Sequence, residues 1–153
     1  MIARFVGIIL GAALACAQPP AAQAQEALTP APKDAVVYFH SPLDGQTVPQ
    51  RVAVRIGLRG MGIAPAGVQK PNTGHHHLLI DTDLPPLDRP VPNDYNHLHL
   101  GNGQTEIRVT LSPGRHTLQL LLADQNHLPH NPPIISKKIT VRVRAGDPDS
   151  NPK

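Results

Sequence analysis

The sequence predicts an all-β protein, an immunoglobulin-like antiparallel β-sandwich of six or seven short strands. Apolar and polar residues alternate in short runs, which is the period of a strand with one buried face. Clusters of Gly, Pro, Asn and Asp separate these runs, and 18 Pro with 12 Gly are too many for a helical bundle. No segment beyond the N-terminal region carries an apolar helical stripe. We place the sandwich domain at residues 36–144.

The first half of this domain contains three predicted strands. Residues 36–40 form the first strand, and the Ser-Pro-Leu-Asp-Gly sequence of residues 41–45 forms a turn. In residues 52–58, Val, Val, Ile and Leu alternate with Ala, Arg and Gly, which predicts a half-buried second strand. A Gly- and Pro-containing loop over 60–74 precedes a third strand over 76–81.

The second half begins with a Pro-rich stretch over 82–96, which cannot be a central strand because proline lacks the N–H donor. Residues 96–100 alternate and predict a short edge strand. Two further strands, 106–111 and 118–122, flank a Pro113-Gly114 turn. Residues 138–144 alternate apolar and polar positions and predict the last strand.

Residues 1–24 have the features of an export signal, which would be removed from the mature protein. Arg4 supplies the positive charge, an apolar run spans 5–15, and Ala22-Gln23-Ala24 is a small-x-small cleavage pattern. The apolar run is too short for a transmembrane helix, so we expect no transmembrane span in the mature chain. The predicted location is the periplasm or the exterior.

Cys16 is the single cysteine, and it falls inside the predicted signal. It leaves one alternative open, a lipoprotein anchored through Cys16, although Leu14 is bulky for a lipobox. Otherwise the mature chain has no cysteine, which excludes a disulfide and a blue-copper site. Residues 25–35 are expected to form a flexible leader and 145–153 a disordered tail.

The composition argues against nucleic acid as a partner. Aromatic residues make up 3% of the chain and Trp is absent, so there is little surface for base stacking. The formal net charge of +3 is too small to indicate a polyanion partner. The unusual feature is nine histidines, and an account of function has to place them.

An antiparallel, Greek-key path would bring histidines from three distant segments to one end of the sandwich, leaving His40 and His116 at the other end. Neutral imidazoles gathered in this way suit zinc or copper(II). The predicted metal ligands are His75, His77, His99, His127 and His130. Three further residues are alternative ligands or groups that orient a ligand ring: His76, His97 and Asp124.

These residues leave three functions open. The first is a periplasmic histidine-rich metal-binding module for storage or delivery of zinc or copper(II), with another periplasmic protein as a candidate partner. The second is a non-catalytic structural or interaction domain with hydrogen-bonded histidines, because a buried histidine such as His76 more often bonds backbone than metal. The third is a cupin-like metalloenzyme, which His97-Leu98-His99 and residues 113–116 faintly suggest. Glu106 follows the paired histidines too late for a cupin motif, which favours a binding module over an enzyme.

Four sequence strings indicate a family. Gly-His-His-His-Leu-Leu-Ile-Asp occupies 74–81, and further distinctive strings occupy 99–105, 114–120 and 124–130. With these strings the chain resembles a bacterial family of exported proteins with a domain of unknown function (DUF4399-type). The resemblance covers roughly residues 36–143 and implies an exported single-domain β protein. It implies no reaction, because the family lacks an established activity.

Overall fold

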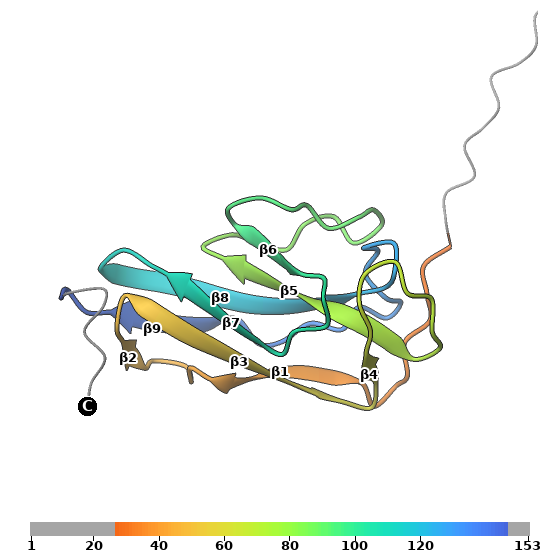
Figure 1. The fold of residues 1–153 in the computed structure, drawn as a ribbon, viewed down its shortest axis with the longest axis horizontal. Helices are drawn as coiled ribbons and strands as arrows, with labels where there is room; N and C mark the ends of the chain where they lie inside the picture. The colour runs from red at the N-terminus through yellow and green to blue at the C-terminus, as the bar shows by residue number, and fades with distance from the viewer. Residues whose placement is uncertain (1–26, 147–153) are drawn as a thin grey trace, which may run out of the picture.

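The computed structural model describes residues 27–146. The predicted export signal, Cys16 and residues 147–153 of the predicted tail lie outside this range. Within it, two β-sheets pack face to face, which confirms the predicted all-β sandwich (Figure 1). The sheets contain nine strands rather than six or seven. No helix in the described part is long and apolar enough to cross a membrane.

The smaller sheet has three antiparallel strands in the order β1-β3-β7, namely β1 (Val36–Ser41), β3 (Arg51–Arg59) and β7 (Glu106–Thr110). Its alternating residues behave as the sequence predicts, because Val52, Val54 and Ile56 are buried against the other sheet. Gly57 lies opposite Tyr38, whose ring covers it so closely that any side chain at position 57 would overlap the ring.

The larger sheet has six strands. Its path runs β2-β9-β8-β5-β4, and β6 also pairs with β5. The pairs β2–β9 and β4–β5 are parallel, so the sheet is mixed and not wholly antiparallel as predicted. β2 and β4 are two residues long, too short for a periodic pattern. β2 lies between the predicted turn and the second predicted strand, and β4 lies inside the predicted loop over 60–74. The bounds are β2 (Thr47–Val48), β4 (Gly62–Ile63), β5 (Thr73–Ile80), β6 (His97–Leu100), β8 (Gly114–Ala123) and β9 (Ile139–Val143).

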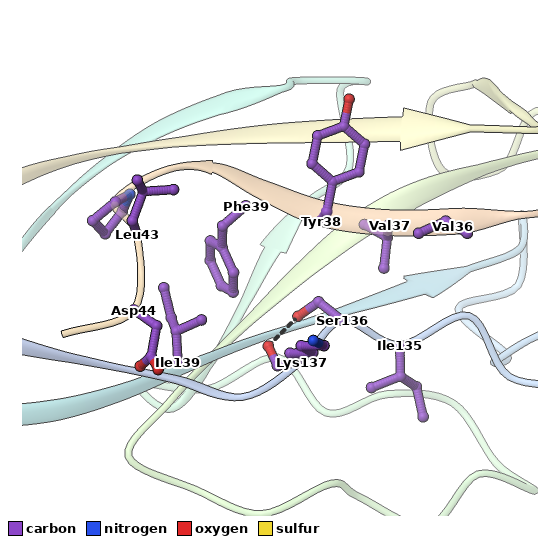
Figure 2. Close-up of a pocket in the computed structure, with 11 residues that line it drawn as sticks. Val36, Val37, Tyr38, Phe39, Leu43, Asp44, Ile135, Ser136, Lys137 and Ile139 are labelled. Carbon is purple, nitrogen blue, oxygen red and sulfur yellow. Dashed lines mark hydrogen bonds between the residues drawn. The ribbon is translucent and has the colours of Figure 1, made fainter. Parts of the chain in front are cut away.

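An apolar groove lies between β1 and the segment that leads into β9 (Figure 2). Phe39 from β1 and Ile139 from β9 point toward each other across it, and its volume is about 320 Å³. Ser136 donates a hydrogen bond to the carbonyl oxygen of Lys137 at its floor. No histidine lines this groove, so it is separate from the site described below.

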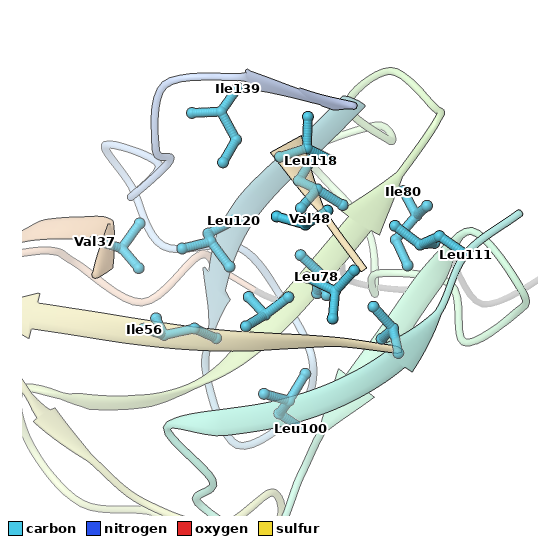
Figure 3. Packing of buried hydrophobic residues seen from close by; sticks show 14 of the residues in the cluster. Val37, Val48, Ile56, Leu78, Ile80, Leu100, Leu111, Leu118, Leu120 and Ile139 are labelled. Carbon is cyan, nitrogen blue, oxygen red and sulfur yellow. The ribbon is translucent and has the colours of Figure 1, made fainter. Parts of the chain in front are cut away.

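The main core fills the space between the two sheets (Figure 3). Leu78, Leu118 and Leu120 are completely buried there, and residues 27–146 contain no cysteine to add a disulfide. A second apolar cluster covers the opposite face of β5, formed by Leu79, Leu121 and Ala123 with Val91 from the loop between β5 and β6. β5 is therefore buried on both faces.

Part of the predicted leader, residues 25–35, is hydrogen-bonded to another segment of the domain. The backbone N–H of Asn131 donates to the carbonyl oxygen of Thr29 at 2.9 Å, and that of Ala31 donates to the carbonyl oxygen of Asn131 at 3.0 Å. These bonds form a parallel bridge between Pro30 and Asn131. The leader thus lies against the segment that follows β8.

Because the described domain has no disulfide, its stability depends on core packing. Leu120→Ala should lower the free energy of unfolding by about 2–5 kcal/mol, since it removes a fully buried side chain between the sheets. Leu43→Ala is the matched control because Leu43 is 63% exposed, and we expect a change within about 0.5 kcal/mol. Urea unfolding measures both, and equal effects would contradict this core assignment.

Candidate metal centre

Strand β5 places two histidines on one face of the larger sheet. Side chains in a strand alternate between faces, so His75 and His77 lie on the outer face with Leu79, while His76 lies on the inner face. Both outer rings are fully buried. Their Nε2 atoms are 3.1 Å apart.

Strand β6 adds a third ring. His99 lies directly opposite His77 in the antiparallel pairing of β5 with β6, so both side chains point to the same face. The centroid of the His99 ring is 5.1 Å from that of His77 and 4.9 Å from that of His75. The ring lies over Gly101, where any side chain would overlap it. Sequence reasoning did not identify this glycine.

The loop after β8 supplies a fourth ring, that of His127. Its centroid is 4.7 Å from the His99 ring, 5.1 Å from the His75 ring and 6.1 Å from the His77 ring. His127 has a left-handed backbone conformation with φ of 66°, which is uncommon for a residue other than glycine. The backbone N–H of Val91 donates to the carbonyl oxygen of His127 at 2.9 Å. We call these four residues, His75, His77, His99 and His127, the histidine cluster.

Three members of the histidine cluster have the geometry to hold a metal ion. His75, His77 and His99 each offer a ring nitrogen, and these atoms lie within 4.8 Å of one another. At the usual metal–nitrogen distance of about 2.0–2.1 Å, two nitrogens 3.1 Å apart subtend roughly 100° at a shared ion. This angle lies between the values of square-planar and tetrahedral coordination.

Burial favours the neutral form of the His75, His77 and His99 rings, which is the form that binds metal. Desolvation first, and then the neighbouring rings of His75, His99 and His127, lower the pKa of His77 to about 2. Desolvation first, and then the rings of His99 and His127, lower the pKa of His75 to about 4, although the carboxylate of Asp124 partly opposes the shift. The pKa of His99 is lowered by the same two causes, burial first and His127 second. The rings of His75, His77 and His99 are therefore difficult to protonate, and each neutral ring keeps a nitrogen lone pair that can bind a metal ion.

Two predicted residues lie on the inner face, away from the histidine cluster. His76 is fully buried between Leu100 and Leu122, its neighbours on β6 and β8. The Cε1 atom of His130 is 3.0 Å from the position that a Cβ of Gly74 would take. Neither nitrogen of either ring has a hydrogen-bond partner among residues 27–146. Neither ring contacts a ring of the histidine cluster within the described part of the chain.

Two other predicted residues lie beside the cluster with hydrogen bonds of their own. Nδ1 of His97 is 2.8 Å from the carboxylate of Asp94. Asp124 accepts three hydrogen bonds, from the hydroxyl of Thr29 and the backbone N–H groups of Asn126 and Leu128. Asp124 therefore shapes the loop that carries His127.

His116 lies at the other end of β8. Its Nδ1 is 2.6 Å from the carboxylate of Asp81, and its Nε2 donates to the backbone carbonyl of Ser112 at 2.8 Å. The Ser112 hydroxyl is farther away, at 3.4 Å from Nε2. Because Nε2 donates to a carbonyl, it has no lone pair with which to activate that hydroxyl, so we read these contacts as structural. The residues that suggest a second cupin motif are thus remote from His97 and His99.

Fold and site together define an all-β sandwich that carries a buried cluster of imidazoles on the outer face of one sheet. Residues 54–144 match the family described as a domain of unknown function (DUF4399), and the protein belongs to this family. No curated protein and no solved structure matches the chain. The family resemblance expected from the sequence strings is therefore confirmed.

The inner-face His76 should make stability depend on pH. Desolvation lowers its pKa to about 4 from 6.5, so its neutral form is favoured in the folded state. This contribution is fully present above pH 6.5 and is lost as the pH falls toward 4, because the unfolded chain then binds the proton more readily. His76→Leu should reduce the stability difference between pH 7.5 and pH 5.0 by on the order of 1–2 kcal/mol.

Urea unfolding in the presence of a chelator measures this difference. His40→Leu is the matched control, because it makes the same substitution at a histidine that is exposed on β1. A His76→Leu protein with the same pH difference as the wild type would contradict the assignment.

Proposed function

We propose that this protein is a periplasmic metal-binding module that holds Zn²⁺ or Cu²⁺ in the histidine cluster for storage or delivery. The observation that carries the proposal is the convergence of three imidazoles from two paired strands, with the ring of His127 from a neighbouring loop beside them. Its location is inferred from the export signal predicted in residues 1–24 and is part of the proposal.

The ring nitrogens favour a metal site over a scaffold of hydrogen-bonded histidines. A scaffold would satisfy its buried donors and acceptors, because an unpaired buried polar atom costs about 1–3 kcal/mol. In the described structure, Nδ1 of His75, Nδ1 of His77 and Nε2 of His99 are buried without a hydrogen-bond partner, as are both ring nitrogens of the inner-face residues His76 and His130. Hydrogen bonds to the rest of the chain therefore do not hold these rings as a scaffold would require. The single hydrogen-bonding contact between rings of the cluster joins the Nε2 atoms of His75 and His77, which are also placed to share an ion.

The donor set indicates which ions fit. Imidazole binds both Zn²⁺ and Cu²⁺, and Cu²⁺ binds more tightly to a given nitrogen site. Asp124 is buried, and its charge acts on the ring of His75, so the surroundings also favour a cation. Met61 is the one methionine in the described residues, and it packs against the main core, so the site is not a thioether site for Cu⁺.

The four rings of the histidine cluster differ in burial, and this difference supports exchange of the ion with solvent. His75 and His77 are fully buried, whereas His99 and His127 are only half-buried. An ion would therefore reach the site from the side of His99 and His127 and be held deepest by the β5 pair. Such an entrance suits delivery better than permanent structural binding.

Substitution of single histidines tests the proposal. Titration of the protein, purified without a polyhistidine tag, with Cu²⁺ or Zn²⁺ should show one ion bound per chain. His77→Ala should weaken binding at least 100-fold, because it removes a deep ligand. His127→Ala should weaken it about tenfold. We expect His130→Ala to keep wild-type affinity, because that ring faces the core.

His40→Ala, at an exposed position on β1, is the control for substitution itself. Circular dichroism of each variant separates loss of ligand from loss of fold. A wild-type chain that binds neither ion, or a folded His77→Ala chain that binds as tightly as the wild type, would overturn the proposal.

A further inference from the structure

We infer that Thr29 is a positioning residue for His127, so that the segment preceding β1 belongs to the metal centre. This inference rests on the proposed function, because it concerns how the fourth ring of that site is held. The chain of contacts runs from the Thr29 hydroxyl through the carboxylate of Asp124 to the backbone on both sides of His127.

Asp124 is the central link in this chain. Its side chain is 1% exposed, and no Lys or Arg in the described range forms an ion pair with it. Its charge is instead stabilised by hydrogen bonds. One oxygen accepts the backbone N–H groups of Asn126 at 2.9 Å and Leu128 at 3.0 Å, and the other accepts the hydroxyl of Thr29 at 2.6 Å.

These bonds surround His127 in the sequence. Its own N–H donates to the carbonyl oxygen of Asp124 at 3.0 Å, and the N–H of Asp124 donates to the carbonyl oxygen of Leu128 at 2.9 Å. A left-handed conformation at a non-glycine residue persists only where the surrounding structure holds it. The orientation of the Asp124 carboxylate therefore fixes the direction in which the His127 ring leaves the loop.

Thr29 is itself held in place. Its carbonyl oxygen accepts the N–H of Asn131, and the N–H of Ala31 donates back to the carbonyl oxygen of Asn131. Thr29 therefore reaches Asp124 from a fixed backbone, across a sequence separation of 95 residues. Without the hydroxyl, one oxygen of the buried Asp124 carboxylate would lose its donor, and that oxygen would no longer be held in its present position.

Thr29→Val tests the inference, because valine keeps the shape of threonine and lacks its hydroxyl. Cu²⁺ titration should show about tenfold weaker binding, the usual effect of removing a group that orients a ligand. The electron paramagnetic resonance spectrum of the Cu²⁺ protein should shift toward that of His127→Ala. Thr29→Ser, which keeps the hydroxyl, should restore both. Thr140→Val on β9, remote from the cluster, is the matched control.

A double substitution separates positioning from a general loss of stability. Thr29→Val in a His127→Ala chain should cause no further loss of affinity, because the ring on which it acts is absent. An equal loss in that background, or wild-type affinity and spectrum in Thr29→Val alone, would overturn the inference. If the wild type binds no Cu²⁺, the proposed function fails instead. Thr29→Ala replaces the valine variant should that chain not fold.

Discussion

The pairing of β5 with β6 is the constraint on which the histidine cluster depends. It sets His99 directly opposite His77, and the two-residue period of β5 brings His75 to the same face. A slip of one residue would send the β6 ring to the opposite face, because strand side chains alternate. Both faces of β5 are covered, so the rings of His75 and His77 cannot turn out to solvent. Burial is the largest of the causes that lower the pKa of His77 to about 2.

The histidine cluster lowers the stability of the folded domain, and packing elsewhere in the domain has to offset this loss. Ring nitrogens without partners and the left-handed backbone at His127 are both unfavourable. The main core offsets them with fully buried leucines, such as Leu78 and Leu120, between the sheets. An ion bound to the folded state alone would add its binding free energy to that of folding. Sites that keep such costs are commonly the functional ones. Here unpaired ring nitrogens occur both in the proposed ligands and in the inner-face residues His76 and His130, whereas the left-handed backbone belongs to the histidine cluster alone among these rings.

Alternation was sufficient to predict the class of fold and the strands with one buried face, but not the short parallel pairs at the sheet edges. In the site, the antiparallel path predicted that histidines from three segments would meet, and their rings do lie together. It placed them at one end of the sandwich, whereas they lie on the outer face of the larger sheet, because His77 and His99 are partners within the β5–β6 pair. The antiparallel path could not predict where the His130 ring lies. Pro129 pairs with Ala123, and the following ring lies against Gly74 on the inner face. Nor could it find Thr29, whose partner Asp124 is remote in sequence and leaves no local pattern.

X-ray absorption spectroscopy of the copper(II)- or zinc-loaded protein identifies the ligands of the ion, because multiple scattering from imidazole counts the histidines bound to it. We expect three or four imidazole nitrogens at about 2.0–2.1 Å from the ion and no sulfur. His77→Ala should remove one of them, and His130→Ala should remove none. Fewer than three imidazoles in the wild type, or an unchanged spectrum in His77→Ala, would show that the ion binds somewhere other than the outer face of β5 and β6.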